Sequence, residues 1–348
     1  STVVIFSYSY CLFLFVVSTK KLKENFPDAQ ELLWSFRMIE VENLTRYYES
    51  RRAINNLSFQ IEKGEVVGFL GPNGAGKSTT MNIISCILPA SSGTVKINGF
   101  DTFEQSLEIR KIIGYLPETP PLYPDMTVAN YLDFAAGVRG VAAKNIPASV
   151  ERVIDKCSLK DVGHRIIGRL SKGYQQRVGL AQAMVHDPEI LILDEPTVGL
   201  DPIQIIEIRK LIQELAAEHT IILSSHILPE ITQICKRVII INEGEIAAVD
   251  SLGGLTASLR KSERLSLTVR NSEDIIIEKL NSMDQVLSVS SEEENQFFIE
   301  CALRSNLQDD IAKLALENHW GIIELKPVSM TLEDIFLKLT LEEKEPAA

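Results

Sequence analysis

Nine consecutive residues, GPNGAGKST, have the types and the spacing that bind a polyphosphate. They match the phosphate-binding loop pattern, in which a glycine and four variable positions precede Gly-Lys-Ser. The glycines of this loop allow turns that bring successive backbone N–H groups around one anion. The lysine can reach the β- and γ-phosphates of a nucleotide, and the serine hydroxyl suits a phosphate-bound magnesium ion. The candidate phosphate-binding residues are Gly71, Pro72, Asn73, Gly74, Ala75, Gly76, Lys77, Ser78 and Thr79.

The residues on both sides of this loop predict a strand, a loop and a helix. The apolar run 65–70 comes directly before the loop, and a helix is expected over 77–88. Such a helix points its N-terminus, with unpaired N–H groups and partial positive charge, at the bound phosphate. The alternative is a glycine-rich turn with a solvated lysine, and the flanking elements disfavour it.

Two neighbouring carboxylates, Asp194 and Glu195, end a continuous aliphatic run that begins at residue 189. Such a run is typical of a strand that is buried on both faces of a parallel sheet. In an open parallel sheet, ligands bind at the carboxyl ends of the strands, so both acids are expected beside the nucleotide. Asp194 can hold magnesium, usually through water, and Glu195 can orient or deprotonate the attacking water. The alternative is an ordinary polar strand end, but the phosphate-binding loop favours a nucleotide hydrolase.

The rest of the first 250 residues predicts an α/β core with an antiparallel β subdomain and a helical insertion. Alternating apolar residues over 39–61 predict antiparallel strands around a turn. Residues 128–170 have helical spacing, with Thr127 as a possible N-cap. Further strand and helix patterns follow in the segments 94–97, 112–116, 170–184, 202–217, 220–225, 238–242 and 245–249.

The last hundred residues predict a separate, small α+β domain. Strand and helix patterns follow one another as βαββαβ from 264 to 328, the order of a ferredoxin-like unit. A final helix is expected over Thr331–Thr340, because Thr331 and Asp334 can form a capping box. No catalytic constellation is present here, so this domain is interpreted as a docking or dimer-supporting module.

The N-terminal stretch is unusual, because Val3–Val17 is almost wholly apolar and a basic patch, Lys20, Lys21 and Lys23, follows it. The run is shorter than the ~20 residues of a membrane-spanning helix. A signal peptide would have its positive charges before the apolar run. We interpret 1–37 as an extension outside the fold, with a membrane-associating tail as the alternative. The expected domains are therefore 38–250, with the helical insertion at about 120–170, and 251–348.

Composition narrows the possible partners and the compartment. The formal net charge of -12 argues against non-specific binding of nucleic acid, which needs many lysines and arginines. The five cysteines are scattered, with no close pair at metal-ligand spacing. We interpret them as small buried residues in a reducing compartment, the cytoplasm.

Residues 39–245 resemble the ATP-binding-cassette (ABC) ATPases. Besides the phosphate-binding loop, the motifs that carry the resemblance are LSKGYQQR (170–177), ILILDEPT (190–197), GLDP (199–202) and SSH (224–226). The resemblance implies a P-loop NTPase fold of the ABC-ATPase type that binds and hydrolyses ATP with Mg²⁺. Five motifs in the order of the family make it highly specific.

The resemblance also implies roles for individual residues. Ser171 and Gly173 would reach the γ-phosphate bound by a second cassette, so that two copies enclose two ATP molecules head to tail. Asp201 would communicate across that interface. His226 would contact the γ-phosphate and hold the attacking water, although a histidine at a strand end is by itself more often an ordinary polar residue.

An adenine-stacking aromatic is implied at Tyr48, with its neighbour Tyr47 as the alternative. Both could instead be ordinary strand aromatics.

Two departures from the family pattern affect these roles. Glu118 stands where the family usually has glutamine, in the loop that senses magnesium and the membrane partner. The signature has Lys172 and Tyr174 in place of the usual glycine and glutamine, but Ser171 and Gly173 are retained. With these variants, the sequence is similar to the single-cassette ATPases of multidrug, polysaccharide and gliding-motility type exporters.

The resemblance implies a chain that works with a separate membrane permease and a second copy of itself. It would lie in the cytoplasm, at the cytoplasmic face of the membrane, and ATP hydrolysis would drive export. One alternative is a soluble cassette that acts on ribosomes or DNA, which the single cassette and the acidic balance disfavour. Another is a regulatory ATP-binding module, although Lys77, Asp194, Glu195 and His226 are all present.

Overall fold

The computed structural model describes residues 2–8, 11–17, 37–251, 253–254, 262–271, 275–293, 295–302 and 307–328. The chain forms two compact units: the first holds Ser1–Lys236 and Glu243–Ile246, and the second holds Arg237–Asn242 and Ala247–Ala348. The domain boundaries expected from the sequence stay predictions. The helix expected over Thr331–Thr340 lies outside the described residues.

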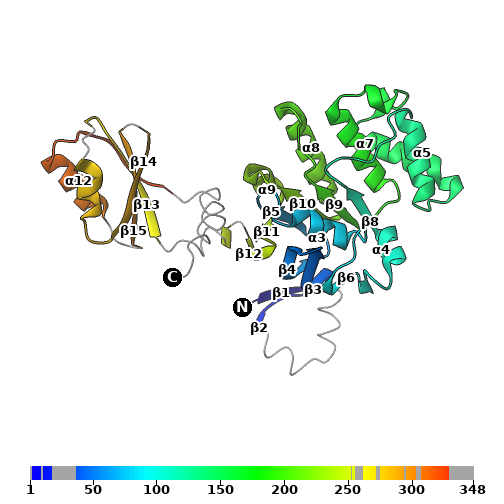
Figure 1. Ribbon diagram of the computed structural model, residues 1–348, viewed down its shortest axis with the longest axis horizontal. Helices are drawn as coiled ribbons and strands as arrows, with labels where there is room; N and C mark the ends of the chain where they lie inside the picture. Colours follow the sequence, from blue (N-terminus) through cyan, green and yellow to red (C-terminus); the bar gives the residue numbers. More distant parts are fainter. Residues whose placement is uncertain are drawn as a thin grey trace. The chain divides into compact units, whose positions relative to one another are not determined.

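A six-stranded sheet carries the strand ends at which the predicted catalytic residues lie (Figure 1). Strands β5, β10, β9 and β8 pair in parallel, so their carboxyl ends meet at one edge. Every residue of these four strands is buried, which explains their continuous apolar sequences. The order across the sheet is β12 (Glu245–Ser251), β11 (Arg237–Asn242), β5 (Val66–Leu70), β10 (Thr220–Ser225), β9 (Ile190–Asp194) and β8 (Ile113–Leu116).

An antiparallel sheet forms the second layer of strands in the first unit. The alternation read over 39–61 is confirmed as a hairpin, and β4 buries every second residue along most of its length. The sheet has the order β4 (Arg51–Glu62), β3 (Arg37–Tyr48), β6 (Ser92–Ile97) and β7 (Phe100–Asp101). Strands β1 (Thr2–Tyr8) and β2 (Cys11–Val17), which the sequence did not predict, form a two-stranded sheet of their own.

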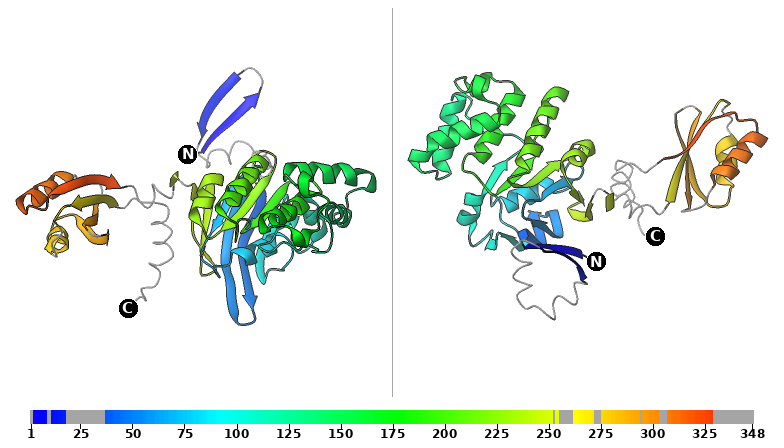
Figure 2. Two further views of the ribbon diagram at one scale, coloured as in Figure 1. Left: turned by 90° about the horizontal axis from the view of Figure 1, so that it is seen from above. Right: turned by 180° about the vertical axis from the view of Figure 1, so that it is seen from behind.

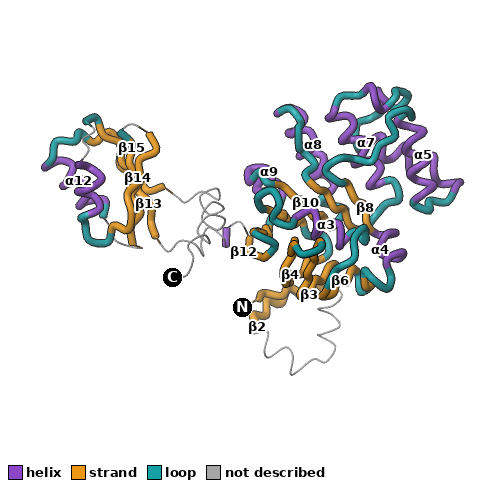
Figure 3. Tube along the Cα trace, in the orientation of Figure 1, coloured by secondary structure: helices purple, strands orange, loops and turns teal. Residues whose placement is uncertain are grey.

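Helices α5 and α7 lie at the end of this unit that is away from the strands β3, β4 and β6, as their purple tubes show (Figure 3). In the predicted helical insertion, α5 and α6 pack against each other and against α7. Thr127 is the N-cap of α5, and its hydroxyl accepts from the backbone N–H of Asn130 at 3.3 Å. The helices of the first unit are α3 (Lys77–Ile84), α4 (Ser106–Ile112), α5 (Val128–Val138), α6 (Ile146–Lys156), α7 (Lys172–Met184), α8 (Pro202–Leu215) and α9 (Leu228–Ile234), with 3-10 turns η1 (Ala143–Asn145), η2 (Lys160–Val162) and η3 (Ile167–Arg169).

Local backbone geometry explains where these helices differ from the predictions. Helix α3 ends at Ile84 rather than Leu88, because Cys86 adopts a left-handed conformation with φ 59°. Helices α4 and α9 were missed, since each has only seven residues and gives a weak periodic signal.

The second unit contains the predicted ferredoxin-like arrangement. Its four antiparallel strands have the order β14-β15-β13-β16, and both helices cover one face of that sheet (Figure 2). Trp320, Leu267 and Ile299 are fully buried in the core between them. The elements are β13 (Ser262–Val269), α11 (Ile275–Asn281), β14 (Val286–Glu293), β15 (Gln296–Ala302), α12 (Gln308–Glu317) and β16 (Ile322–Val328).

Four cysteines, Cys86, Cys157, Cys235 and Cys301, are buried as thiols outside any disulfide. Burial raises the pKa of Cys86 to about 11 and that of Cys157 and Cys235 to about 12, which disfavours the reactive thiolate. The side chain of Cys11 lies outside the described residues. Among the helices of the described ranges, none has both the length and the apolar character needed to cross a bilayer.

Strand β8 and helix α7 approach so closely that the position of Gly114 has no room for a side chain. A Cβ at Gly114 would lie 2.1 Å from the backbone oxygen of Ala183. We expect Gly114→Ala to lower the free energy of unfolding by about 1–3 kcal/mol, because backbone must move to accept the methyl group. Urea denaturation followed by circular dichroism measures this effect. Gly137→Ala in α5 is the matched control, because nothing lies within 4 Å of its added Cβ. Equal midpoints for the two variants would contradict the expectation.

Candidate functional site

The loop 71–79 has the left-handed glycines that a phosphate-binding turn needs. Gly74 has φ 82° and Gly76 has φ 106°, and Gly76 is the N-cap of α3. A Cβ at Gly76 would lie 2.9 Å from the backbone oxygen of Ala53, so the loop also packs tightly against strand β4. The first turn of α3, which begins at Lys77, therefore directs its free N–H groups into the loop.

Lys77 spans this loop from inside. Its Nζ donates to the backbone oxygens of Gly71 at 2.8 Å and Pro72 at 3.2 Å. The same ammonium lies 3.4 Å from Oε1 of Glu195, and only 5% of Lys77 is exposed. The cation predicted to bind phosphate and the carboxylate predicted to activate water therefore face each other.

The two predicted acids follow one another at the end of β9, and Ser224 at the end of β10 fixes both. Ser224 pairs in register with Asp194. Its hydroxyl donates to Oδ1 of Asp194 at 2.5 Å and accepts from the backbone N–H of Glu195 at 2.9 Å. Glu195 has a left-handed backbone with φ 48°, a conformation that is costly for a residue with a side chain. Strain of this kind is typical of a position whose orientation matters for function.

His226 completes the contacts of the Glu195 carboxylate. Its Nδ1 lies 2.7 Å from Oε2 of Glu195, so a lysine and a histidine approach the two oxygens of one carboxylate. This arrangement comes from the ends of three adjacent strands, β5, β10 and β9.

The residue Glu230, which the sequence analysis did not single out, holds together the loops that follow β9 and β10. Its Oε2 accepts from the hydroxyls of Thr197 at 2.6 Å and Ser225 at 3.0 Å. Glu230 is 5% exposed although it lies in the short helix α9. A glutamate within a helix gives no sequence signal of such burial.

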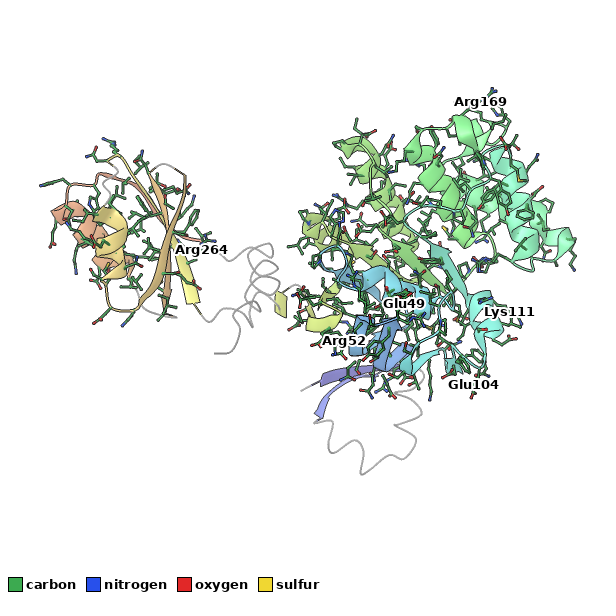
Figure 4. The ribbon with its side chains drawn as sticks, in the orientation of Figure 1. Glu49, Arg52, Glu104, Lys111, Arg169 and Arg264 are labelled. Carbon is green, nitrogen blue, oxygen red and sulfur yellow. The ribbon has the colours of Figure 1, made fainter. Side chains whose placement is uncertain are left out.

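A cavity of about 810 Å³ opens over the phosphate-binding loop. Tyr48 lines it, whereas Tyr47 is not among its lining residues, and the Arg46 guanidinium lies 5.1 Å from the centre of the Tyr48 ring. Arg51 and Arg52 at the turn of the β3–β4 hairpin also line it, and Figure 4 labels Arg52. The lining consists of Tyr48, Arg51, Arg52, Ala53, Asn73, Gly74, Gly76, Lys77, Ser78, Thr79, Glu118, Glu195, Val198, His226 and Glu243.

Ser171, Gly173 and Asp201 line a different cavity, of about 880 Å³, beside α7 and α8. Ser171 caps α7, and Asp201 caps α8 by accepting from the N–H of Gln204 at 2.9 Å. A Cβ at Gly173 would lie 2.6 Å from the Gln204 side chain, so this glycine permits close packing of the two helices. Within one chain, these three residues therefore do not line the cavity of Lys77.

The candidate magnesium ligands lie in two places, the wall of the cavity and the buried edge of the sheet. Ser78 and Glu118 are exposed and line the cavity that contains Lys77. Asp194 is 3% exposed, and none of the ion pairs found among the described residues involves it. Burial, and secondarily the Asp194 carboxylate, raise the pKa of Tyr115. The hydroxyl and carboxylate oxygens of these residues are of the ligand type that magnesium prefers.

Comparison with known proteins identifies the family. The ABC transporter family model matches residues 54–198. The bacitracin transport ATP-binding protein BcrA of Bacillus licheniformis is 35% identical over 306 residues, which cover 87% of this chain and 97% of BcrA. The chain belongs to the ABC transporter ATP-binding proteins. The linearmycin resistance ATP-binding protein LnrL of Bacillus subtilis (strain 168) is 30% identical, over 87% of this chain and 98% of LnrL.

Solved structures agree with this assignment to the ABC family. The ATP-binding subunit of an ABC transporter superposes with a TM-score of 0.58 and 29% identity, over 64% of this chain and 92% of that one. The dimeric ATP-binding cassette MJ0796 in a post-hydrolysis state, bound to ADP and Pi, superposes with a TM-score of 0.57 and 25% identity. The match covers 62% of this chain and 99% of that one. The predicted ABC-ATPase fold is confirmed, and the chain is the ATP-binding cassette subunit, an ATPase, of an ABC transporter.

Ser224 is expected to be essential for the geometry of the acid pair in this ABC cassette. Ser224→Ala removes the donor to Asp194 and the acceptor for the Glu195 N–H, which leaves both groups buried without that partner. We expect the free energy of unfolding to fall by about 1–3 kcal/mol, because an unsatisfied buried group costs about that much. Chemical denaturation measures the loss.

Ser224→Thr is the matched control, because it keeps the hydroxyl and should restore most of the stability. An alanine variant as stable as the unmodified chain would contradict this expectation.

Proposed function

We propose that this chain binds ATP with magnesium in the 810 Å³ cavity and hydrolyses it to drive export through a separate membrane permease. The observation that supports the proposal is the Glu195 carboxylate, which lies 3.4 Å from the Lys77 ammonium and 2.7 Å from the His226 ring. This contact supports a shared role at the γ-phosphate, with Lys77 as the phosphate-binding cation and Glu195 as the general base.

In the proposed reaction, a water molecule attacks the γ-phosphorus, and the bond from that phosphorus to the oxygen of ADP breaks. Glu195 accepts the proton of the water, and His226 holds the water and the γ-phosphate in place. Lys77 and the backbone N–H groups of residues 71–79 stabilise the charge on the phosphates. Because Lys77 now bonds to the loop's own carbonyls, ATP would replace those contacts with phosphate oxygens.

Magnesium would be held by Ser78 and Asp194, with Glu118 as an additional ligand from the cavity wall. The ion would supply positive charge that offsets the negative charge of the phosphates. Glu118 adds a full negative charge where the family usually has a neutral glutamine, which would favour a divalent ion at this position.

At the opposite end of the cavity, Tyr48 would stack on the adenine ring. Tyr48 is 42% exposed and lines the cavity, and an aromatic ring is suited to stacking on a flat base.

A second copy of the chain would complete the site in the proposed mechanism. Ser171, Gly173 and Asp201 line a separate cavity, so a head-to-tail partner is needed to bring them to the γ-phosphate bound at Lys77. Similarity to a dimeric cassette bound to ADP and Pi supports this arrangement.

The relatives support an exporter at the cytoplasmic face of a membrane. BcrA is named for bacitracin transport, and LnrL for linearmycin resistance. The helical insertion would pass the opening and closing of the dimer to the permease, which would also contain the substrate pathway.

Glu195→Gln tests the proposed base. The variant keeps the shape of the side chain but cannot accept the proton, so we expect kcat to fall by about 10²–10⁴ while ATP binding persists. Steady-state ATPase assays measure kcat, and size-exclusion chromatography with ATP is expected to show a trapped dimer. Lys77→Ala is the comparison variant, because it should lose ATP binding itself. Hydrolysis by Glu195→Gln at the unmodified rate would remove Glu195 from this role.

Asp194→Asn tests the proposed magnesium site. Loss of the charge should raise the Mg²⁺ concentration for half-maximal ATPase activity by about tenfold or more, because magnesium prefers charged oxygen ligands. A titration with Mg²⁺ at saturating ATP measures the change. Asp133→Asn, an exposed change in α5, is the control and should leave the titration unaltered. Superimposable curves for both variants would exclude Asp194 as a ligand.

A further inference from the structure

Glu243 lines the same cavity as Lys77, and the reaction proposed above gives it no role. It occupies the turn between β11 and β12, with a left-handed backbone of φ 47°, and its side chain is exposed. Its neighbour Gly244 fixes the turn, because its N–H donates to the oxygen of Ala75 at 3.0 Å and its oxygen accepts from the N–H of Asn55 at 2.8 Å. The turn is therefore bonded to the phosphate-binding loop on one side and to strand β4 on the other.

These contacts hold the turn of Glu243 against both strand β4 and the phosphate-binding loop. Tyr48, which also lines the cavity, pairs with Arg51 at the start of β4. Lys77 begins α3 within the phosphate-binding loop. The turn of Glu243 also packs closely against both elements. A Cβ at Gly244 would lie 2.8 Å from the oxygen of Ala53 in β4. A Cβ at Gly76, in the phosphate-binding loop, would lie 3.6 Å from Cα of Gly244.

The charge on Glu243 restricts what it can face. A carboxylate only accepts hydrogen bonds, so a triphosphate placed against it would be repelled. The nearby acid of the same hairpin, Glu245, has a different environment, because it pairs with Arg52 at 3.6 Å. None of the ion pairs found in the described part of the chain involves Glu243. Its carboxylate is thus available to a neutral group that donates hydrogen bonds.

We propose that the Glu243 carboxylate accepts hydrogen bonds from the ribose hydroxyls of ATP, and that it makes the cavity select ribonucleotides over deoxyribonucleotides. In ATP, the ribose lies between the base and the phosphates, and the turn of Glu243 contacts both strand β4, which pairs with Tyr48, and the loop that contains Lys77. A vicinal diol donates two hydrogen bonds, and a carboxylate is the acceptor that dinucleotide-binding folds also use for a ribose. The inference rests on the proposed placement of ATP in this cavity.

The test compares the affinities of ATP, 2′-deoxy-ATP and 3′-deoxy-ATP. Isothermal titration calorimetry with Mg²⁺ on the full chain suits it, in the Glu195→Gln background to prevent turnover. Unlabelled nucleotides are needed, because ribose-linked fluorophores would block the hydroxyls. We expect at least one deoxynucleotide to bind the parent about tenfold more weakly than ATP, the effect of one hydrogen bond to a charged group. Adding Glu243→Ala should reduce that difference to about twofold or less, because the acceptor is then absent.

Glu49→Ala is the matched control. Glu49 is also an exposed glutamate in a strand-connecting turn, with φ 53° against 47° for Glu243, and it does not line the cavity. Figure 4 labels it at the β3–β4 turn. The control removes the same charge from a similar backbone, and the full preference for ATP should persist.

Two results would overturn the inference alone. One is a Glu243→Ala variant that binds ATP and keeps the parent's ratio of ATP to deoxynucleotide affinity. The other is a Glu243→Ala variant that changes the ratio of the affinities for ATP and inosine triphosphate but not the ratio for ATP and the deoxynucleotides. That result would mean that the carboxylate contacts the base and not the ribose. Failure of the Glu195→Gln parent to bind ATP would overturn the proposed function together with this inference.

Discussion

The contact between the Lys77 ammonium and the Glu195 carboxylate is stable only because neighbouring parts of the cassette compensate for its burial. Both side chains are nearly inaccessible, and a buried ion pair is tolerated only when its geometry and its further hydrogen bonds compensate for lost hydration. The loop carbonyls of Gly71 and Pro72 supply that compensation to the lysine, and His226 supplies it to the glutamate. In the proposed mechanism, a triphosphate would meet a lysine and a glutamate whose positions these bonds already fix.

This contact depends on the order of strands in the parallel sheet. The lysine follows β5, the glutamate follows β9 and the histidine follows β10, and β10 lies between the other two. A parallel sheet aligns the carboxyl ends of its strands, so residues more than a hundred positions apart in the sequence share one edge. The Ser224 hydroxyl accepts from the N–H of Glu195, which helps to keep its strained backbone in place. Glu230 joins Thr197, which follows β9, to Ser225 at the end of β10.

The two cavities are lined by different sets of the candidate site residues. One is lined by the phosphate-binding loop, Glu195 and Tyr48, and the other by Ser171, Gly173 and Asp201 at the starts of helices α7 and α8. Since the two sets lie in different cavities, a mechanism that uses both requires a second molecule. Dimer closure and catalysis would therefore be one event, which suits a machine that converts hydrolysis into movement of a partner.

The sequence by itself determined the fold and most of the candidate residues, because each motif is local. The glycine spacing of 71–79 constrains the backbone directly, and a buried parallel strand must be apolar at every position, as β9 is. Tertiary structure alone decided how these motifs meet. It showed that Tyr48 rather than Tyr47 lines the cavity, that Glu243 also lines it, and that Glu230 joins Thr197 to Ser225. Each of these contacts joins positions that are distant in the sequence, and a single side chain makes it. Periodicity and spacing do not show which surface a turn or a short helix will contact.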